Sequence, residues 1–241
     1  MLLMILIGLY SYRKSANTSD DFLIGGRKIG PFVTALSAGA ADMSGWLLMG
    51  LPGAMYMSGI SSSWIAIGLT TGAFLNYVLV APRIRTYTEI AKNSITLPVF
   101  FENRFHDKTQ LLKITASLFI LIFFTLYTSA GMVSGGRLFE SAFAMDYHTG
   151  LIATSLVVVF YTFIGGFLAV SLTDFVQGTI MVIALIIVPV VILQEVGGMK
   201  ETFTIIENKN VEYLSLFRGI STVGIFSLLA WGLGYFGQPH I

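Results

Sequence analysis

The chain has 241 residues, of which 55% are hydrophobic and 11% charged, and its formal net charge is +1. Soluble domains carry about 25% charged residues, so this composition excludes an ordinary water-soluble domain. The small net charge argues against a nucleic-acid partner, because no basic region is concentrated enough to neutralise a phosphate backbone. The lack of cysteine excludes disulfides, thiolate metal sites and a cysteine nucleophile.

Seven apolar segments are predicted to cross a lipid bilayer as helices, because lipid cannot satisfy open backbone groups. The first, Met1–Tyr12, is too short to span and is interpreted as the second half of a span. The others lie at Phe32–Met57, Trp64–Ala81, Leu111–Gly136, Leu151–Val170, Phe175–Leu193 and Ile220–Ile241. The sequence therefore predicts an all-α polytopic membrane protein, with residues 1–241 as one transmembrane domain that is incomplete at both ends.

Lysine and arginine residues set the expected orientation of these spans. The linkers after the first and third segments fall on the same side of the membrane and hold four plus six, or 10, of the 14 basic residues. These are Arg13, Lys14, Arg27, Lys28, Arg83, Arg85, Lys92, Arg104, Lys108 and Lys113. The pattern predicts that loop 82–110 is cytoplasmic and that loop 194–219 is external and holds a short surface helix.

The second segment is a poor helix around an intramembrane charge. Residues 35–46 read ALSAGAADMSGW, which places Asp42 near the middle of the span among glycine and serine residues. A carboxylate there costs about 2.5–3.5 kcal/mol, so it is expected to face a cavity, a partner or an ion. The alternative is that Asp42 only caps a break in the helix. The two interpretations are compatible, because a break with free carbonyl groups is itself a cation site.

The seventh segment ends in WGLGYFGQPHI, residues 231–241, where three glycines and Pro239 weaken the helix. Trp231 and Tyr235 are four residues apart, so both rings are expected on one helical face. Gln238 adds a polar group, and close glycine packing between helices is the alternative interpretation. Segments two to six make five spans, so segment seven would begin a second, inverted set of five. Two broken helices at the first position of inverted repeats is the arrangement that places substrate and ions at the membrane midplane.

The other motifs in the sequence give less information about function. Gly232 to Gly237 matches G-x-G-x-x-G, but it lies in an apolar span without a preceding strand, so a dinucleotide site is rejected. No catalytic constellation supports an enzyme. Gly131 and Gly135 are predicted to serve helix packing. Ser171 to Asp174 is predicted to cap the sixth segment, and Tyr127 is expected either to line a cavity or to bond another helix.

Three stretches resemble the sodium:solute symporter family. They are LIGGRKIGPFVTALSAGAADMSGWLLMGLPG (residues 23–53), YTFIGGFLAVSLTDFVQG (161–178) and WGLGYFGQPHI (231–241). The similarity extends over essentially the whole chain. It implies a leucine-transporter-like fold of five plus five inverted helices, usually within about thirteen spans, of which this chain holds the first repeat and the start of the second.

The resemblance also implies functional residues by motif position. Asp42, with the backbone carbonyls of Ala40 and Met43, would bind sodium. The implied substrate-binding positions are Ser44, Gly45, Trp46, Tyr127, Trp231, Tyr235 and Pro239, to which Gln238 is added from its place at the second break. Arg27 and Asp174 would couple the two solutes. The family's remaining sodium ligands lie on a later helix, beyond this chain.

The implied function is sodium-coupled symport of L-proline across the plasma membrane of a bacterium, by alternating access, with Na⁺ as the coupling ion. Three alternatives remain open: a carrier of another small carboxylate or polar solute, the membrane sensor module of a signalling kinase, and a channel.

Overall fold

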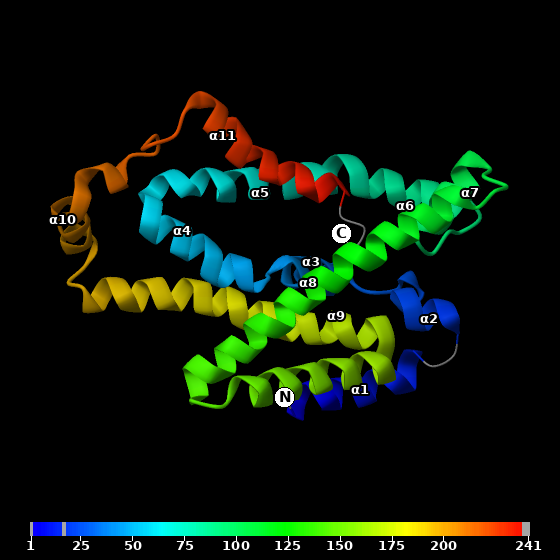
Figure 1. Cartoon of the computed structure of the whole chain (residues 1–241). Helices are drawn as coiled ribbons and strands as arrows, with labels where there is room; N and C mark the ends of the chain where they lie inside the picture. Colours follow the sequence, from blue (N-terminus) through cyan, green and yellow to red (C-terminus); the bar gives the residue numbers. More distant parts are fainter. Residues whose placement is uncertain (1, 16–17, 238–241) are drawn as a thin grey trace. The chain divides into compact units, whose positions relative to one another are not determined.

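The computed structural model describes residues 2–15 and 18–237, and these residues form helices joined by short connections (Figure 1). They divide into two compact units. The first unit comprises residues 1–45 and 88–180, and the second comprises residues 46–87 and 181–241. Each unit is described by itself.

Unit 1 begins with α1 (Leu2–Ser15), α2 (Ser19–Ile24), the 3₁₀ turn η1 (Gly25–Arg27) and α3 (Pro31–Asp42). Pro31 stands in the first turn of α3, where its missing N–H costs nothing. After residue 87 the unit continues with the end of α6 (Ala81–Ile90), then α7 (Leu97–Phe105) and α8 (Leu111–Phe143). It closes with the first part of α9 (Tyr147–Glu195), up to residue 180.

The 49 residues of α9 are not one straight helix. Gly166 has φ 57° and ψ −152°, a conformation open essentially to glycine alone, and the ribbon reverses direction there (Figure 1). At 1.5 Å per residue a straight helix of this length would measure about 74 Å, more than twice the thickness of the hydrocarbon core. The reversal therefore divides α9 into two helical segments.

The predicted cap at Ser171 to Asp174 is wrong, because these residues lie inside α9 and the chain turns at Gly166 instead. A side chain at Gly166 would collide with Phe22 of α2, because its Cβ would stand 2.6 Å from the Phe22 backbone oxygen. Glycine is thus required there both by the backbone angles and by the close approach of α2.

Unit 2 begins with a π-helix, η2 (Trp46–Gly50), followed by α4 (Leu51–Ser58) and the 3₁₀ turn η3 (Gly59–Ser62). Next come α5 (Ser63–Leu75), a second π-helix η4 (Asn76–Val80) and the start of α6. The unit resumes with the end of α9, then α10 (Met199–Asn210) and the turn η5 (Val211–Leu214). It ends with α11 (Thr222–Leu229) and a 3₁₀ helix, η6 (Ala230–Gly237). The short helix expected in loop 194–219 is α10.

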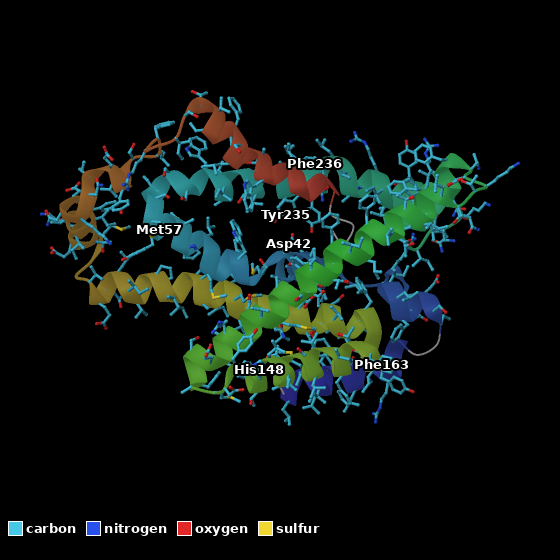
Figure 2. All side chains as sticks on the ribbon, viewed as in Figure 1. Asp42, Met57, His148, Phe163, Tyr235 and Phe236 are labelled. Carbon is cyan, nitrogen blue, oxygen red and sulfur yellow. The ribbon has the colours of Figure 1, made fainter. Side chains whose placement is uncertain are left out.

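In the described residues, three helical stretches are long and apolar enough to cross a membrane, namely Leu51–Ile90, Leu111–Phe143 and Tyr147–Glu195. Shorter apolar helices cover Leu2–Arg13 and Thr222–Gly237. Large apolar side chains project outward, such as Phe163 of α9, which is 81% exposed (Figure 2). Exposed apolar surface on this scale suits contact with lipid.

Candidate functional site

The expected break in the second segment is present directly after Asp42, the last residue of α3. Met43 leaves the helix with ψ 79°, and its N–H bonds back to the carbonyls of Gly39 and Ala40 at 3.2 and 3.1 Å. The N–H of Ser44 bonds to the carbonyl of Asp42 at 2.8 Å. Because a helix C-terminus carries partial negative charge and unpaired carbonyl groups, this end of α3 suits a cation.

Tyr127 of α8 bonds to the same helix end. Its hydroxyl donates to the carbonyl of Ala41 at 2.6 Å, so the tyrosine orients one of the last carbonyl groups of α3. The sequence left two roles open for Tyr127, lining a cavity or hydrogen-bonding to another helix, and named no partner. The structure shows a hydrogen bond to another helix. Ala41 itself was missed, because side-chain chemistry does not distinguish one backbone carbonyl from the next.

Asp174 of α9 also contacts α3. The hydroxyl of Ser37, five residues before Asp42, donates to the Asp174 carboxylate at 3.0 Å. The two helices approach closely because Gly178 of α9 has no side chain: a Cβ there would lie 3.3 Å from the Cβ of Ala40. Asp174, expected to couple the two solutes, therefore contacts α3, the helix that ends at the expected sodium ligand Asp42.

Arg27 lies in the linker between α1 and α3 and joins the second basic linker. Its guanidinium donates to the carbonyl of Ser94 at 3.3 Å, and it lies 3.6 Å from the carboxylate of Glu89 at the end of α6. Arg27 is partly buried and adopts a positive φ of 55°. It therefore ties together the connections that precede α3 and α7.

The expected substrate residues of unit 2 include an aromatic pair. The rings of Trp46 and Trp231 stack with centroids 4.9 Å apart and planes 20° from parallel. Trp46 stands in η2 and Trp231 in η6, so each ring comes from an irregular helix. Gly50 gives Trp46 room, since a Cβ at residue 50 would lie 2.8 Å from the indole Cδ1. Stacking of this kind contributes about 0.5–1.5 kcal/mol beyond area burial.

At the position expected for the second break, α11 passes without interruption into the 3₁₀ helix η6 at Ala230. A 3₁₀ run of 8 residues is unusual, since such runs seldom exceed 3–4 residues. The expectation that Trp231 and Tyr235 share one face is wrong. At 3.0 residues per turn, positions four apart differ by about 120°. Tyr235 instead shares a face with Gly232, three residues before it.

That face packs against α5 through glycine. A Cβ at Gly72 would lie 2.6 Å from the Cα of Gly232, and a Cβ at Gly68 would lie 2.6 Å from the carbonyl oxygen of Leu229. The backbones therefore touch without intervening side chains. Sequence reasoning missed this contact, although the spacing of Gly68 and Gly72 is the same small-residue signal that was noted at Gly131 and Gly135. At the latter pair, Gly135 approaches Thr154 while Gly131 has open space around it.

The predicted site residues thus fall into two groups. Unit 1 holds Arg27, Ala40, Asp42, Met43, Ser44, Gly45, Tyr127 and Asp174, and unit 2 holds Trp46, Trp231 and Tyr235. Gln238 and Pro239 lie outside the described residues.

Comparison with known proteins identifies the family of the chain. Residues 22–241 match the sodium:solute symporter family. The chain is 60% identical over 238 residues to the osmoregulated proline transporter OpuE of Bacillus subtilis, covering 99% of this chain and 48% of that protein. It is 56% identical over 240 residues to the sodium/proline symporter of Staphylococcus aureus, covering 100% of this chain and 47% of that protein.

The chain spans about half the length of these relatives. No solved structure matches the chain. The family match over most of the chain and the identity to proline transporters agree with the apolar helices, and the chain belongs to the sodium:solute symporter family of multi-pass membrane proteins.

Proposed function

We propose that the protein carries L-proline into a bacterial cell together with sodium, by alternating access. The observation that carries the proposal is the end of α3, where the helix stops at Asp42 and Tyr127 fixes a neighbouring carbonyl. Carboxylate and carbonyl oxygens at a helix C-terminus are what broken-helix transporters use for sodium. The Bacillus and Staphylococcus relatives are both named for proline, which supports the choice of solute.

In this proposal the residues have distinct roles. Asp42 binds sodium with the carbonyls of Ala40 and Met43. The residues that bind proline are Ser44, Gly45, Trp46, Tyr127, Trp231, Tyr235, Gln238 and Pro239. An aromatic face suits the apolar ring of proline, and its secondary ammonium suits cation–π contact. Arg27 and Asp174 couple the two solutes, which the contact of Asp174 with α3 supports.

The proposed architecture is the inverted repeat of five plus five helices. Its support is that the first helix of each expected set is irregular: α3 ends at Asp42, and α11 changes to a 3₁₀ helix at Ala230. The proposed orientation places loop 82–110 in the cytoplasm and loop 194–219 outside. The contact of Arg27 with Ser94 and Glu89 supports it, because it joins two linkers that the distribution of basic residues places on one side.

The sodium gradient supplies enough energy for this function. A potential of 100 mV gives about 2.3 kcal/mol per charge, and a tenfold sodium ratio adds about 1.4 kcal/mol. The sum, about 3.7 kcal/mol, supports a few-hundred-fold accumulation of proline.

The test is sodium-dependent uptake by the full-length protein in proteoliposomes. Asp42→Asn should raise the sodium concentration for half-maximal uptake about tenfold or more, because hydrogen bonds and contacts to a charged group are worth about 1.5–3 kcal/mol. The proline concentration for half-maximal uptake should change much less. Glu207→Gln, an exposed carboxylate of α10, is the matched control. Unchanged sodium dependence in Asp42→Asn would reduce Asp42 to a helix cap. Uptake of a different solute in preference to proline would show that proline is not the main substrate.

A further inference from the structure

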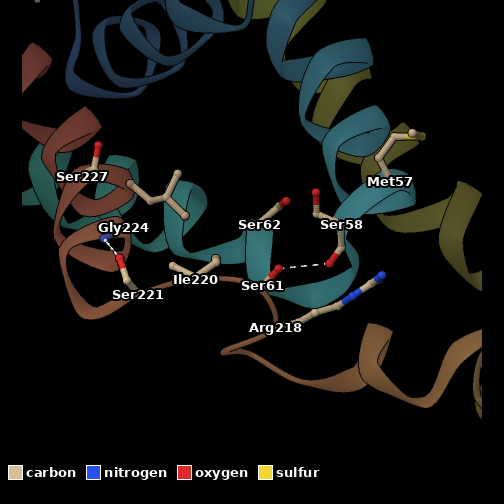
Figure 3. A pocket seen from close by; sticks show the side chains of 11 residues that line it. Met57, Ser58, Ser61, Ser62, Arg218, Ile220, Ser221, Gly224 and Ser227 are labelled. Carbon is tan, nitrogen blue, oxygen red and sulfur yellow. Dashed lines mark hydrogen bonds between the residues drawn. The ribbon is translucent and has the colours of Figure 1, made fainter.

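Unit 2 contains a pocket that none of the predicted site residues lines. It has a volume of about 530 Å³ and lies between the α4–α5 turn and the start of α11 (Figure 3). One wall is formed by serines of the turn and the opposite wall by residues of α11, namely Ser58, Ser61, Ser62, Ser221, Gly224 and Ser227. Arg218 borders the same pocket, so hydroxyl groups and a cation meet at the ends of these helices.

Aromatic side chains surround the segment that carries Arg218. The indole N–H of Trp64 donates to the carbonyl of Leu216 at 3.0 Å, and the Trp64 ring lies 6.1 Å from that of Phe217. The guanidinium of Arg218 lies over the ring of Tyr213, 4.1 Å from the centroid. Tryptophan and tyrosine are enriched at the membrane–water interface, because one end of each ring is apolar and the other is polar. This set of side chains is therefore typical of the depth at which lipid headgroups lie.

The outer face of α11 beside the pocket is apolar. Val223 and Phe226 are exposed there, and Met57, which lines the pocket from α4, is exposed as well. Ile220 and Leu228 add apolar surface to the lining. In a multi-pass membrane protein such a surface suits contact with acyl chains. A ligand that carries both an anionic group and hydrocarbon chains would match the pocket and the surface next to it.

The charge of Arg218 is only partly compensated within the chain. Its Nε lies 3.5 Å from the carboxylate of Glu212, which is 68% exposed and therefore well screened by water. The Arg218 side chain is 24% exposed, and its Nη1 is buried without a hydrogen-bond partner in the part of the chain that the structure describes. Because a partly buried charge is costly without a close partner, an anion in the pocket would be stabilised by this guanidinium.

The start of α11 supplies further attraction for an anion. Ser221 accepts the N–H of Gly224 at 3.2 Å, so its own hydroxyl hydrogen remains to donate, whereas Ser61 and Ser62 already donate to nearby backbone carbonyls. The positive end of the α11 dipole lies at the same place. The hydroxyl, the helix start and the guanidinium can each serve a different oxygen of one tetrahedral group, which favours a phosphate over a planar carboxylate.

We infer that this pocket binds the phosphate group of an anionic phospholipid, whose acyl chains cover the exposed face of α11. The net negative charge of phosphatidylglycerol suits an incompletely compensated arginine better than a zwitterionic headgroup does. In the proposed orientation, residues 218–221 follow an external loop, so the lipid belongs to the outer leaflet. The inference does not depend on which solute the protein carries.

Protection of a cysteine tests this inference in the full-length protein, made free of other cysteines and purified in detergent. Ser227→Cys places a thiol on the pocket wall, and a water-soluble maleimide measures its accessibility. We expect phosphatidylglycerol in the micelles to slow the reaction severalfold. Diacylglycerol with the same acyl chains lacks the phosphate and should not slow it. Glycerophosphate and inorganic phosphate lack the chains, and they and proline should have little effect.

Variants in the Ser227→Cys background sharpen the test. Arg218→Gln should raise the amount of phosphatidylglycerol needed for half-maximal protection about tenfold, the effect of losing one charge-assisted hydrogen bond. Arg218→Lys, which keeps the charge, should raise it less. Glu212→Gln removes the competing carboxylate and should lower the amount needed, a gain that damage to the fold cannot mimic. Arg137→Gln removes an exposed arginine outside the pocket and should change nothing.

Each contrary result has a definite meaning. Equal protection by diacylglycerol would reduce the pocket to an apolar contact with lipid, and equal protection by glycerophosphate or inorganic phosphate would assign it to a soluble anion. Protection by proline would assign it to the solute, and protection that survives Arg218→Gln would remove the arginine from the site. All four overturn the inference. Uptake of proline is measured separately, so the failure of the lipid site would leave the carrier function standing, and the reverse also holds.

Discussion

The hydroxyl of Tyr127 donates a hydrogen bond to the carbonyl of Ala41 at 2.6 Å, one residue before the helix ends at Asp42. A tyrosine from a different helix thus holds the backbone between two of the proposed sodium ligands, Ala40 and Asp42. The bond aligns the chain locally, so its loss should alter ion binding before it alters the fold.

Tyr127→Phe should therefore weaken sodium binding severalfold, since one hydrogen bond contributes about 0.5–1.5 kcal/mol. The measurement is the sodium dependence of proline uptake at saturating proline. Thr125→Val is the matched control, because the Thr125 hydroxyl bonds within its own helix, to the carbonyl of Leu121. Equal effects of both variants would assign the change to general perturbation of α8.

Trp46 and Trp231 should act as a coupled pair. Replacing either ring by alanine should lower the apparent affinity for proline, and the double variant should lower it by less than the sum. The expected coupling is about 0.5–1.5 kcal/mol, the typical value for stacked rings. A double-mutant cycle on proline uptake measures it, with Trp64→Phe as a control outside the pair. Strict additivity would show that the stack has no part in substrate binding.

The glycine contact between α5 and η6 should tolerate no added methyl group. In Gly72→Ala the new Cβ would lie 2.6 Å from the Cα of Gly232, and backbone cannot move aside as a side chain can. We expect a loss of about 1–3 kcal/mol of stability, as in other overpacked cores. Thermal unfolding in detergent, followed by near-ultraviolet circular dichroism, measures it. Gly131→Ala in α8 should be neutral or stabilising, because outside the local helix backbone no atom of the described residues would lie within 4 Å of the added Cβ. A neutral Gly72→Ala would contradict the close approach.

Orientation can be tested with two single cysteines on exposed residues of the two loops. A cysteine in place of Glu207 should react with an impermeant thiol reagent added to intact cells, and a cysteine in place of Lys108 should react only after the membrane is opened. The physical reason is the retention of positively charged linkers in the cytoplasm. The opposite pattern would invert the proposed topology, and it would leave the helix contacts unchanged.

The sequence was informative wherever a residue contradicts its surroundings. Asp42 is a charge in an apolar span, and the helix does end there. The sequence was uninformative where the outcome depends on backbone conformation or on the type of helix. In the sequence, Gly166 does not differ from the other glycines of the apolar segments, although the chain reverses there. The hydroxyl-rich stretch Ser171 to Asp174 resembled a helix cap, although it lies inside α9. Tyr235 was assigned the wrong face because sequence spacing alone does not distinguish a 3₁₀ helix from an α-helix.

The Trp46–Trp231 stack has an optical consequence. The 241 residues contain three tryptophans, and two of them share one stacked pair. Indole rings at a centroid distance of 4.9 Å couple their excited states, so their circular dichroism and emission depend on separation and tilt. Trp64, bonded to the carbonyl of Leu216, lies outside the pair and supplies a reference signal. Any solute that separates the two rings will change the spectrum of the unlabelled chain. The spectrum would therefore report on η2 and η6 at the same time.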